Sequence, residues 1–437
     1  MKQQNIMKTK LARITEISKE RPKEIFTSIY HFMNKELLIM CHNELDGKKA
    51  TGLDGVTKAE YDENLEKNIE QLERNLQSMS YRPEPARRVY IPKANGKLRG
   101  LSIAKYEDKI VQLALKKIIE AIYEPKLLDC MYGFRPNRGC HQALKVLNRN
   151  IERGKVSYVV EADIKGFYDH VDHEWLIKCV EQHIKDMKII RLIKRFLKAG
   201  IMEEGKYIKT TEGTPQGSIL SPILANIYMH YVLALWFEKK IRMSFKGESY
   251  ITIYADDYVC CFQYKKEAEQ FYKELLPNRL KKFNLELAED KTRLIEFGKF
   301  AQENSKNGKP ETFDFLGFTH YCSKAKDGRF RVKRKTSRKK KSMKIKEYKI
   351  WIKENRNKEL KYIIKKTNEK LRGHYQYFGI TDNSKMLEQY YLQIKRLIFK
   401  WLNRRSQRKS YNYEQFEEML KIYPLIKPKI YVNIYDI

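Results

Sequence analysis

The sequence predicts an α+β protein that is followed by a smaller, all-helical C-terminal domain. Between residues 157 and 318, short apolar strands alternate with longer helical patterns, of which residues 265–280 are the clearest. The composition then changes sharply, because nine Lys or Arg and no acidic residue lie between residues 331 and 344. Beyond this run, apolar side chains recur at helical spacing in two stripes, residues 360–371 and 387–401.

The elements that precede this pattern are helices and one hairpin. Thr57 and Glu60 make a capping box ahead of a charged helix that runs to about Gln77. Two strand patterns then flank Asn95-Gly96, the favoured chemistry for a two-residue hairpin turn. The predicted regions are an N-terminal helical extension (1–80), the α+β domain (81–320), a basic linker (321–345) and the helical domain (346–437).

Composition limits the partners of this chain. Its 437 residues carry a formal net charge of +33, and the 42% of hydrophobic residues are enough to fill a core, so disorder throughout is excluded. A folded surface this basic attracts polyanions. Nucleic acid is therefore the first expected partner and an acidic membrane surface the second, whereas small neutral metabolites are not expected.

Cysteines and hydropathy indicate the compartment. Seven cysteines without a CxxC pair argue against a disulfide framework and a zinc module, so a reducing, cytoplasmic location is expected; residues 1–14 also lack the apolar core of a signal peptide. Residues 214–237 contain no charge and are long enough to cross a bilayer, but a span would bury Gln216 and His230 in lipid. We expect a buried helix after a polar loop, and no membrane partner.

Two neighbouring carboxylates, Asp256 and Asp257, lie between two apolar strand patterns. Adjacent like charges repel, so a divalent cation is expected beside them, and Asp163 follows another apolar strand that would end at the same place. Two Mg²⁺ ions held between Asp163 and Asp256 would activate a 3′ oxygen and stabilise a pyrophosphate leaving group. Taken alone, the pair is also explained by a solvated turn, and Asp163 by a helix N-cap.

Further motifs accompany these carboxylates in a fixed order. They are residues 51–57 (TGLDGVT), 87–93 with 96–99 (RRVYIPK, GKLR), 132–138 (YGFRPNR), 163–169 (DIKGFYD), 213–217 with 220–222 (GTPQG, LSP), 254–257 (YADD), Lys291, 315–318 (FLGF), 371–375 (LRGHY) and 401–406 (WLNRRS). In these motifs the sequence resembles the reverse transcriptase/maturases encoded by bacterial group II introns, of the kind that lacks an endonuclease domain. It departs from the common family pattern after Arg99 and at Ser218.

The resemblance implies a right-hand polymerase, with fingers and palm in the α+β domain and a thumb, or maturase domain, in the helical one. Its implied catalytic residues are Asp163, Asp256 and Asp257, with Asp163, Ile164 and Asp256 at the metal site. Nucleotide binding is assigned to Lys93, Arg99, Phe167, Tyr168 and Gln216, and template or primer binding to Lys291, Leu316 and Gly317. Intron RNA binding is assigned to Arg334, Lys335, Arg338 and Lys339.

Several of these assignments have alternatives in the residues themselves. Lys93 and Arg99 suit a triphosphate as a point charge and a fork, but they also fit a solvated basic edge. Either Phe167 or Tyr168 would wall off a ribose 2′-hydroxyl, or both are core aromatics. The basic run fits structured RNA beside an aromatic thumb, or a solvated linker.

The expected function is RNA-directed DNA synthesis from dNTPs with two Mg²⁺ ions, together with binding of a parent group II intron RNA to assist its splicing and copy it during mobility. The partners are then the intron RNA, an RNA template and a DNA primer or target. Two rivals are a related reverse transcriptase recruited to defence or another task, and an RNA-binding maturase without polymerase activity. The thumb motifs argue against the first rival and the intact carboxylates against the second.

Overall fold

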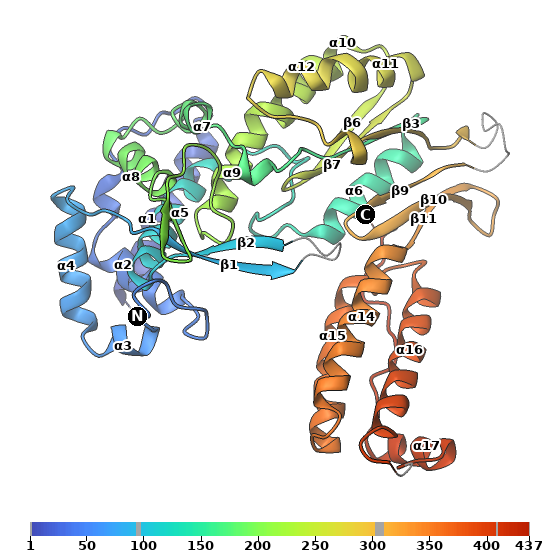
Figure 1. Ribbon diagram of the computed structural model, residues 1–437. Helices are drawn as coiled ribbons and strands as arrows, with labels where there is room; N and C mark the ends of the chain where they lie inside the picture. Colours follow the sequence, from blue (N-terminus) through green and yellow to red (C-terminus); the bar gives the residue numbers. More distant parts are fainter. Residues whose placement is uncertain (1, 93–97, 302–309, 408–409, 437) are drawn as a thin grey trace.

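The computed structural model describes residues 2–92, 98–301, 310–407 and 410–436. Figure 1 shows two parts: a broad body built from helices and three sheets, and a helical bundle that projects from one end of it. The helices of the bundle begin after residue 337, and the C-terminal segment returns to the body, where Tyr435 contacts β11 and Asp436 contacts α6. The predicted order, an α+β domain followed by a helical domain, is confirmed.

Of four N-terminal helices, α1 and α2 pack on α5 (Tyr106–Tyr123), α4 packs on α2, and α3 packs on α4. The Thr57–Glu60 capping box is present at the start of α3. The predicted single helix is interrupted between α3 and α4, and α4 ends at Gln77 as predicted. Apolar residues of these helices belong to the same core as the central sheet, so residues 1–80 are integrated into the body. The helices are α1 (Lys2–Glu20), α2 (Lys35–Glu44), α3 (Lys58–Asp62) and α4 (Leu65–Gln77).

A four-stranded sheet follows, with the order β2-β1-β4-β5. Its first two strands form the predicted antiparallel hairpin, in which Ile91 pairs with Arg99. The turn at Asn95-Gly96, and Lys93, lie outside the described residues. The strands are β1 (Ala86–Pro92), β2 (Leu98–Ile103), β4 (Ile201–Glu203) and β5 (Lys206–Ile208).

The central sheet has the order β6-β7-β3-β8 and separates two hydrophobic cores. Because side chains alternate along a strand, Val160 and Cys260 face the core shared with α9, whereas Val159 and Cys261 face the core shared with α6. The strands are β3 (Tyr158–Ala162), β6 (Ser249–Tyr254), β7 (Asp257–Phe262) and β8 (Arg293–Glu296).

The remaining helices of the body include α9 and α6, which cover opposite faces of this sheet (Figure 1). These remaining helices are α6 (Cys140–Arg153), α7 (His173–Val180), α8 (Met187–Leu197), α9 (Ser221–Met229), α10 (Arg242–Ser244), α11 (Lys265–Gln270) and α12 (Leu276–Lys281). Three π-helical segments join them into longer helices: η3 (His230–Ala234), η4 (Phe237–Ile241) and η5 (Phe271–Leu275). Short 3₁₀ segments are η1 (Tyr30–Phe32), η2 (Phe167–Asp169) and η6 (Glu289–Lys291).

The uncharged stretch 214–237 is a loop followed by α9 and its π-helical continuation, as predicted, and most of its apolar residues are buried in the core; Tyr231, Leu235 and Trp236 are partly exposed. Within the described part of the chain, no helix combines the length and the apolar composition that crossing a membrane requires.

The segment predicted as a basic linker is regular structure, which corrects that prediction. A third sheet, with the order β11-β10-β9, occupies most of it, and the thumb begins directly after Ser337. The strands are β9 (Thr312–Phe315), β10 (Phe318–Lys324) and β11 (Phe330–Thr336). Arg331, Lys333 and Lys335 alternate along β11 with three buried residues, Val332, Arg334 and Thr336, so this segment is a strand with an inner and an outer face and does not extend as a free linker.

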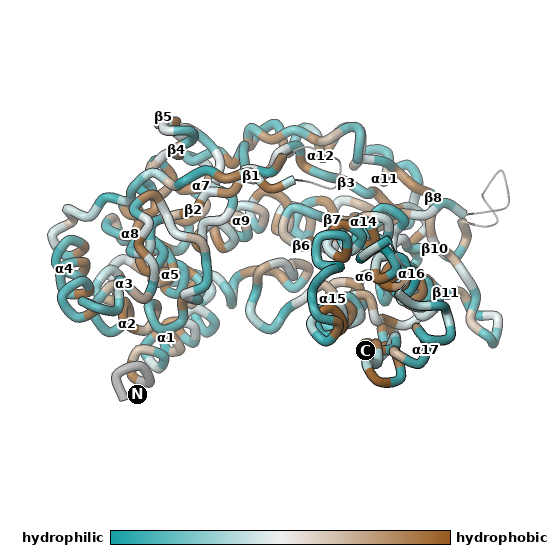
Figure 2. Tube along the Cα trace, turned by 60° about the horizontal axis from the view of Figure 1, so that its bottom comes forward, coloured by the Kyte–Doolittle hydropathy of each residue, from teal (hydrophilic) through white to brown (hydrophobic). Residues whose placement is uncertain are grey.

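The thumb is a bundle of amphipathic helices. The two predicted apolar stripes are confirmed, because they fall on α15 and α16 and supply their buried residues. Figure 2 shows apolar and hydrophilic residues alternating along these helices. The helices are α14 (Arg338–Asn355), α15 (Leu360–Phe378), α16 (Ser384–Leu402) and α17 (Tyr413–Ile422).

Candidate active site

Strand register brings the predicted carboxylates together. In the antiparallel β3–β7 pair Ala162 faces Tyr258, so Asp163, one residue further, lies beside Asp257. Asp256 occupies the turn of the β6–β7 hairpin, which the Tyr254–Asp257 pair closes. Three carboxylates from two distant segments therefore meet at one end of the central sheet.

The turn that carries Asp256 is strained and held from the side. Ala255 has φ 58°, a left-handed conformation that costs a residue with a side chain about 1–2 kcal/mol. Gly133 packs directly against it: a Cβ at Gly133 would lie 2.3 Å from the Ala255 nitrogen. The Tyr132 N–H donates to the Ile253 carbonyl at 2.9 Å, and the Asn226 side-chain amide donates to the Gly133 carbonyl at 2.8 Å. These contacts fix the position of the carboxylate turn.

Each of these carboxylates makes the ionised form of its neighbours less favourable. Burial raises the pKa of Asp256, and the neighbouring Asp163 raises it further. Asp257 contacts solvent inside the cleft, yet the surrounding protein, with Asp256 and Asp163, raises its pKa to about 6. A bound cation would offset this repulsion and favour the ionised forms.

The Lys291 ammonium group donates a hydrogen bond to Asp163 Oδ2, and this bond raises the pKa of the lysine. The side chain predicted to meet template or primer thus lies against a catalytic carboxylate. The protein itself supplies one positive charge where a metal ion would sit, so an ion binding to Asp163 would have to move or accompany this lysine.

One cleft of about 790 Å³ is lined by seven of the predicted site residues. Asp163, Asp257, Arg99 and Lys291 line it, together with the β9–β10 turn at Leu316-Gly317. The lining also contains residues that the sequence did not single out as site residues, among them Ser337, Lys340 and Met343 at the start of the thumb. Three further acidic residues line the same cleft: Glu161, Asp290 and Asp314. These thumb residues lie in the basic run between residues 331 and 344. Because that run was interpreted as a linker, the sequence did not predict helix α14, which brings Lys339 and Lys340 to the cleft that contains the carboxylates.

The two adjacent aromatics have different surroundings. Phe167 is buried and packs against Tyr228, as a core aromatic does, and its assignment to the nucleotide stays a prediction. Tyr168 is only partly buried and interacts electrostatically with Asp256 and Arg99. Ile164 also has a buried side chain; its backbone bridges to Leu287.

Gln216 lies in a loop that rests on the fingers strand β2. Its backbone carbonyl accepts from the Ser102 N–H at 2.7 Å, and its side-chain amide donates to Asp169 at 3.4 Å. Gly217 has φ 104°, and a Cβ there would lie 2.8 Å from the Ser102 carbonyl oxygen. The close approach of loop and strand therefore requires glycine.

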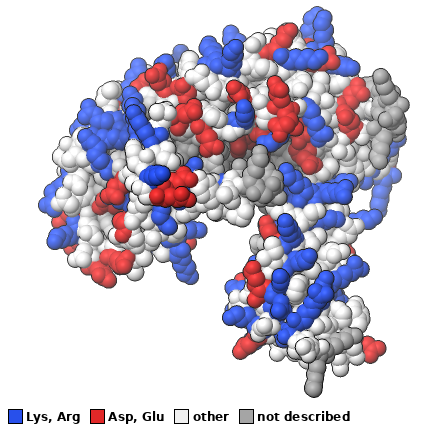
Figure 3. Space-filling view, viewed as in Figure 1, with Lys and Arg blue, Asp and Glu red and all other residues white. Residues whose placement is uncertain are grey.

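Three of the four predicted RNA-binding residues are exposed and one is not. Arg334 is fully buried, where its guanidinium donates to Asn148 of α6 and to the Val332 carbonyl, so its assignment to RNA is wrong. It cannot reach a phosphate because it points inward from β11. Lys335, Arg338 and Lys339 are exposed. Figure 3 shows Lys and Arg gathered over the thumb and its junction with the sheets.

Comparison with known proteins identifies the class. A family model described as "Reverse transcriptase (RNA-dependent DNA polymerase)" matches residues 91–320, just over half of the chain, so the chain belongs to the reverse transcriptase family. A second model, "Group II intron, maturase-specific domain", matches residues 338–419 and begins at the first residue of α14. Members of the family generally use divalent metal ions and act with nucleic acid.

Particular relatives are intron-encoded proteins. The group II intron-encoded protein LtrA of Lactococcus lactis subsp. cremoris is 42% identical over 241 residues, which are 55% of this chain and 40% of the relative. The uncharacterized 91 kDa protein in cob intron of Schizosaccharomyces pombe is 36% identical over 49% of this chain and 26% of its own length. Protein YkfC of Escherichia coli K12 is 38% identical over 42% of this chain and 49% of its own length. The alignments thus span less than half of each relative.

The residues present fit a divalent cation site. Among the residues that the structure describes, no group of three or more His, Cys, Asp or Glu is placed to hold a metal ion without ligands from elsewhere. Mg²⁺ is typically held by one or two carboxylates together with substrate phosphates, and the mutually repelling Asp163, Asp256 and Asp257 offer such an open site.

Proposed function

We propose that this chain is an RNA-directed DNA polymerase that extends a primer on an RNA template with dNTPs, and that it binds a group II intron RNA, assists its splicing and copies it. The observation that carries the proposal is the β3–β7 register, in which Asp163 lies beside Asp257. The cleft around them is also lined by Arg99, by the Leu316-Gly317 turn and by the basic start of α14. The seven cysteines, all free, suit a reducing cytoplasm.

We assign the metal role to Asp163, Asp256 and Asp257. When bound, two Mg²⁺ ions would lower the charge at the reacting oxygens of the primer and the leaving pyrophosphate. The carboxylates orient these ions, and the strained turn held by Gly133 keeps Asp256 in place. Lys291 neutralises Asp163 in their absence, which lowers the cost of grouping three negative charges.

The nucleotide would lie between this centre and the fingers. Arg99 lines the same cleft and interacts with Asp256, so its guanidinium suits the triphosphate as a fork; Lys93 is assigned the same role. Tyr168, the partly buried aromatic, would face the sugar and exclude a 2′-hydroxyl. Gln216 would contact sugar or template from its loop on β2.

Nucleic acid would enter along the thumb side of the cleft. The Leu316-Gly317 turn is placed to meet the primer, and Lys339 and Lys340 line the wall beside it. The first turn of α14 has cations and no acidic residue, although the partial positive charge of a helix N-terminus disfavours cations. Phosphates bound there would offset the charge of these cations and the partial positive charge of the helix N-terminus. Lys335 and Arg338 extend this basic surface toward intron RNA.

Primer extension tests the proposal. With oligo(dT) on poly(rA), dTTP and Mg²⁺, Asp256→Asn should lower incorporation at least a hundred-fold, because the charge that orients the ion is lost where it is needed most. Asp46→Asn, an exposed carboxylate in a loop of the N-terminal region, is the control and should extend normally. Incorporation by Asp256→Asn near that of the control would contradict the assignment.

A further inference from the structure

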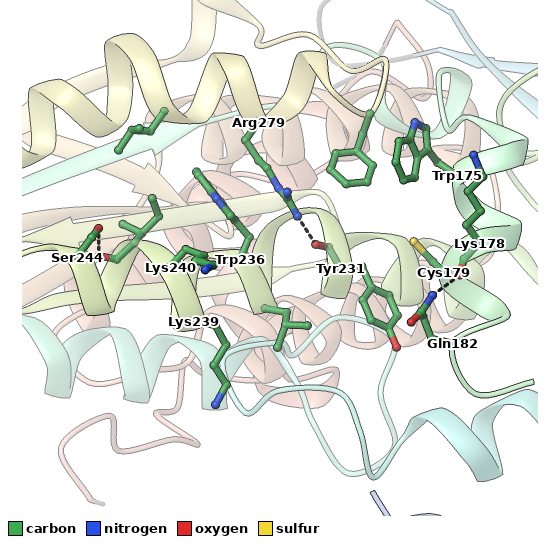
Figure 4. Close-up of a pocket in the computed structure, with 14 residues that line it drawn as sticks. Trp175, Lys178, Cys179, Gln182, Tyr231, Trp236, Lys239, Lys240, Ser244 and Arg279 are labelled. Atoms are coloured by element: carbon green, nitrogen blue, oxygen red, sulfur yellow. Dashed lines mark hydrogen bonds between the residues drawn. The ribbon is translucent and has the colours of Figure 1, made fainter. Parts of the chain in front are cut away.

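A second cavity, of about 830 Å³, opens on the body of the protein; we call it the palm pocket. Its walls come from α7, from the helix that continues α9 through η3 and η4, and from α12. It shares no lining residue with the catalytic cleft, so it does not belong to the active site described above. Figure 4 shows the side chains that line it.

Aromatic rings and cations make up this lining. Trp175, Tyr231, Trp236 and Phe283 supply ring surface, and every formally charged residue of the lining is a cation. No Asp or Glu of the described part of the chain lines the pocket. Figure 4 shows Arg279 entering from α12, with Trp175 and Lys178 across the cavity from Lys239 and Lys240.

One cation is fixed in the wall and three are exposed at the rim, of which Lys178 also lies 4.8 Å from the centre of the Trp175 ring. The Arg279 guanidinium donates to the carbonyls of Tyr231 and Val232, each at 2.8 Å, and lies 4.6 Å from the centre of the Phe283 ring. It therefore forms a rigid planar group within the pocket wall. Lys178, Lys239 and Lys240 are exposed, which leaves their ammonium groups able to contact phosphates.

The wall formed by η3 and η4 has an unusual geometry. In a π-helix the hydrogen bonds join residues five apart, which aligns Tyr231, Trp236 and Ile241 on one side, and all three line the pocket. The carbonyls that accept from Arg279 lie in this segment. π-helical turns are rare and occur frequently at functional sites, so the aromatic face is a built feature of the helix.

The charge of the molecule selects the occupant. A second copy of a chain with a net charge of +33 would meet this cationic rim with repulsion, and no acidic side chain in the pocket attracts a basic partner. Single-stranded RNA offers both complements at once: bases that stack on aromatic and guanidinium planes, and phosphates that pair with lysines.

We propose that the palm pocket binds unpaired RNA nucleotides, with one or two bases placed among Trp175, Tyr231 and Trp236 and their phosphates on Lys178, Lys239 and Lys240. This inference rests on the RNA binding proposed above and adds a site to it. Such a site would hold a single-stranded segment of the bound RNA on the palm while the cleft remains free for primer and template.

The test uses the full chain, first saturated with a primer–template duplex so that the cleft is filled. The probe is a fluorescent uridine dodecamer, followed by anisotropy over a range of salt concentrations. Trp175→Leu should weaken its binding about ten-fold, within the range for losing one stacked base. Lys239→Gln/Lys240→Gln should lower the slope of log K against log salt by up to about 1.4, because each single-strand phosphate that a lysine no longer neutralises lowers it by about 0.7.

Matched controls keep this test decisive. Lys265→Gln/Lys266→Gln removes the same charge from adjacent exposed lysines on α11, outside the pocket, and should bind the dodecamer as the native chain does. The lysine pair in the pocket serves alone if Trp175→Leu does not fold. A dodecamer carrying 5-iodouridine should crosslink to Trp175, Tyr231 or Trp236, as mapped by mass spectrometry.

Three results would overturn the inference. They are equal binding by pocket and control variants, crosslinks confined to residues outside the pocket, or an RNA-free dimer in light scattering that the pocket lysine substitutions dissociate, which would assign the pocket to a second copy. The pocket variants should extend primers normally, because they do not touch the cleft. Failure of the native chain to extend primers would instead refute the proposed polymerase activity.

Discussion

Tyr377 of the thumb holds the turn that we assign to the primer. Its hydroxyl donates to the Leu316 carbonyl at 3.0 Å, and its ring stacks on Phe318 at 6.0 Å between centres. Leu316 has φ 50°, which costs a residue with a side chain about 1–2 kcal/mol. A hydrogen bond of this kind contributes about 1 kcal/mol net. The bond is thus comparable to the strain that it opposes.

Tyr377→Phe removes the hydroxyl and keeps the ring. Without this bond the Leu316-Gly317 turn would adopt other conformations more often. Primer–template would then have to restore the present conformation when it binds, which lowers its affinity. Since about 1.4 kcal/mol corresponds to ten-fold, losing about 1 kcal/mol should raise the dissociation constant of primer–template about five-fold. The KM for dNTP should not change, because Arg99 lies on the fingers strand. Single-turnover extension, titrated separately with primer–template and with dNTP, measures both constants.

A double-mutant cycle isolates the mechanism. Asparagine tolerates the left-handed conformation, so in a Leu316→Asn background Tyr377→Phe should cost less than two-fold. Cys140→Ala controls for the thiol that also contacts this hydroxyl, and Tyr362→Phe for an exposed tyrosine on the same helix. Unchanged primer–template affinity in Tyr377→Phe, or an equal cost in both backgrounds, would refute the reasoning.

Three further predictions concern charge. Incorporation should fall as pH drops through about 6, because Asp257 must be ionised to hold a cation, and more Mg²⁺ should move the midpoint lower; a pH–rate profile at two Mg²⁺ concentrations checks this. Burial raises the pKa of Asp108, which is 1% exposed, to about 7, so the folded state keeps a proton that the unfolded state releases above about pH 4. From pH 4 to 7 the native chain should therefore lose up to about 4 kcal/mol relative to Asp108→Asn, measured by urea unfolding; parallel curves would contradict it. Arg334→Gln should lower the melting temperature and leave the salt slope of RNA binding unchanged, whereas Arg338→Gln should lower that slope by about 0.7; the opposite pattern would restore Arg334 to the RNA surface.

The catalytic carboxylates could be predicted because their signal is local. Asp256 and Asp257 interrupt two apolar strand patterns, and Asp163 ends a third, so strand ends alone indicate that they meet. The partners that hold them could not be read in the same way. Gly133 lies more than a hundred residues before the turn it supports, and Lys291 is 128 residues from Asp163. Such pairs depend on tertiary packing, which leaves no periodic trace.

The basic run shows where composition misleads. Counting charges between residues 331 and 344 suggested a solvated linker, but the same residues alternate in register with β10, and Arg334 pairs with the buried His320. A cation at an inward position breaks the usual pattern of a strand, and its partner Asn148 belongs to α6. Phe167 and Tyr168 pose the same difficulty on a smaller scale, since the 3₁₀ turn η2 alone decides which ring enters the core.

Two strained turns border the cleft, and one segment reaches both. Gly133 packs beneath Ala255 at the carboxylate turn, and eight residues further His141 contacts the Tyr377 carbonyl at 2.8 Å, on the residue that holds Leu316. Residues held in such conformations persist only where their surroundings over-determine them. Because the chain from Gly133 to His141 touches the supports of both turns, a shift of the thumb would be transmitted to the primer turn first and, through this segment, to Asp256. If RNA binds along α14 and α15 as we propose, this segment gives it a physical route to the geometry of the proposed catalytic centre.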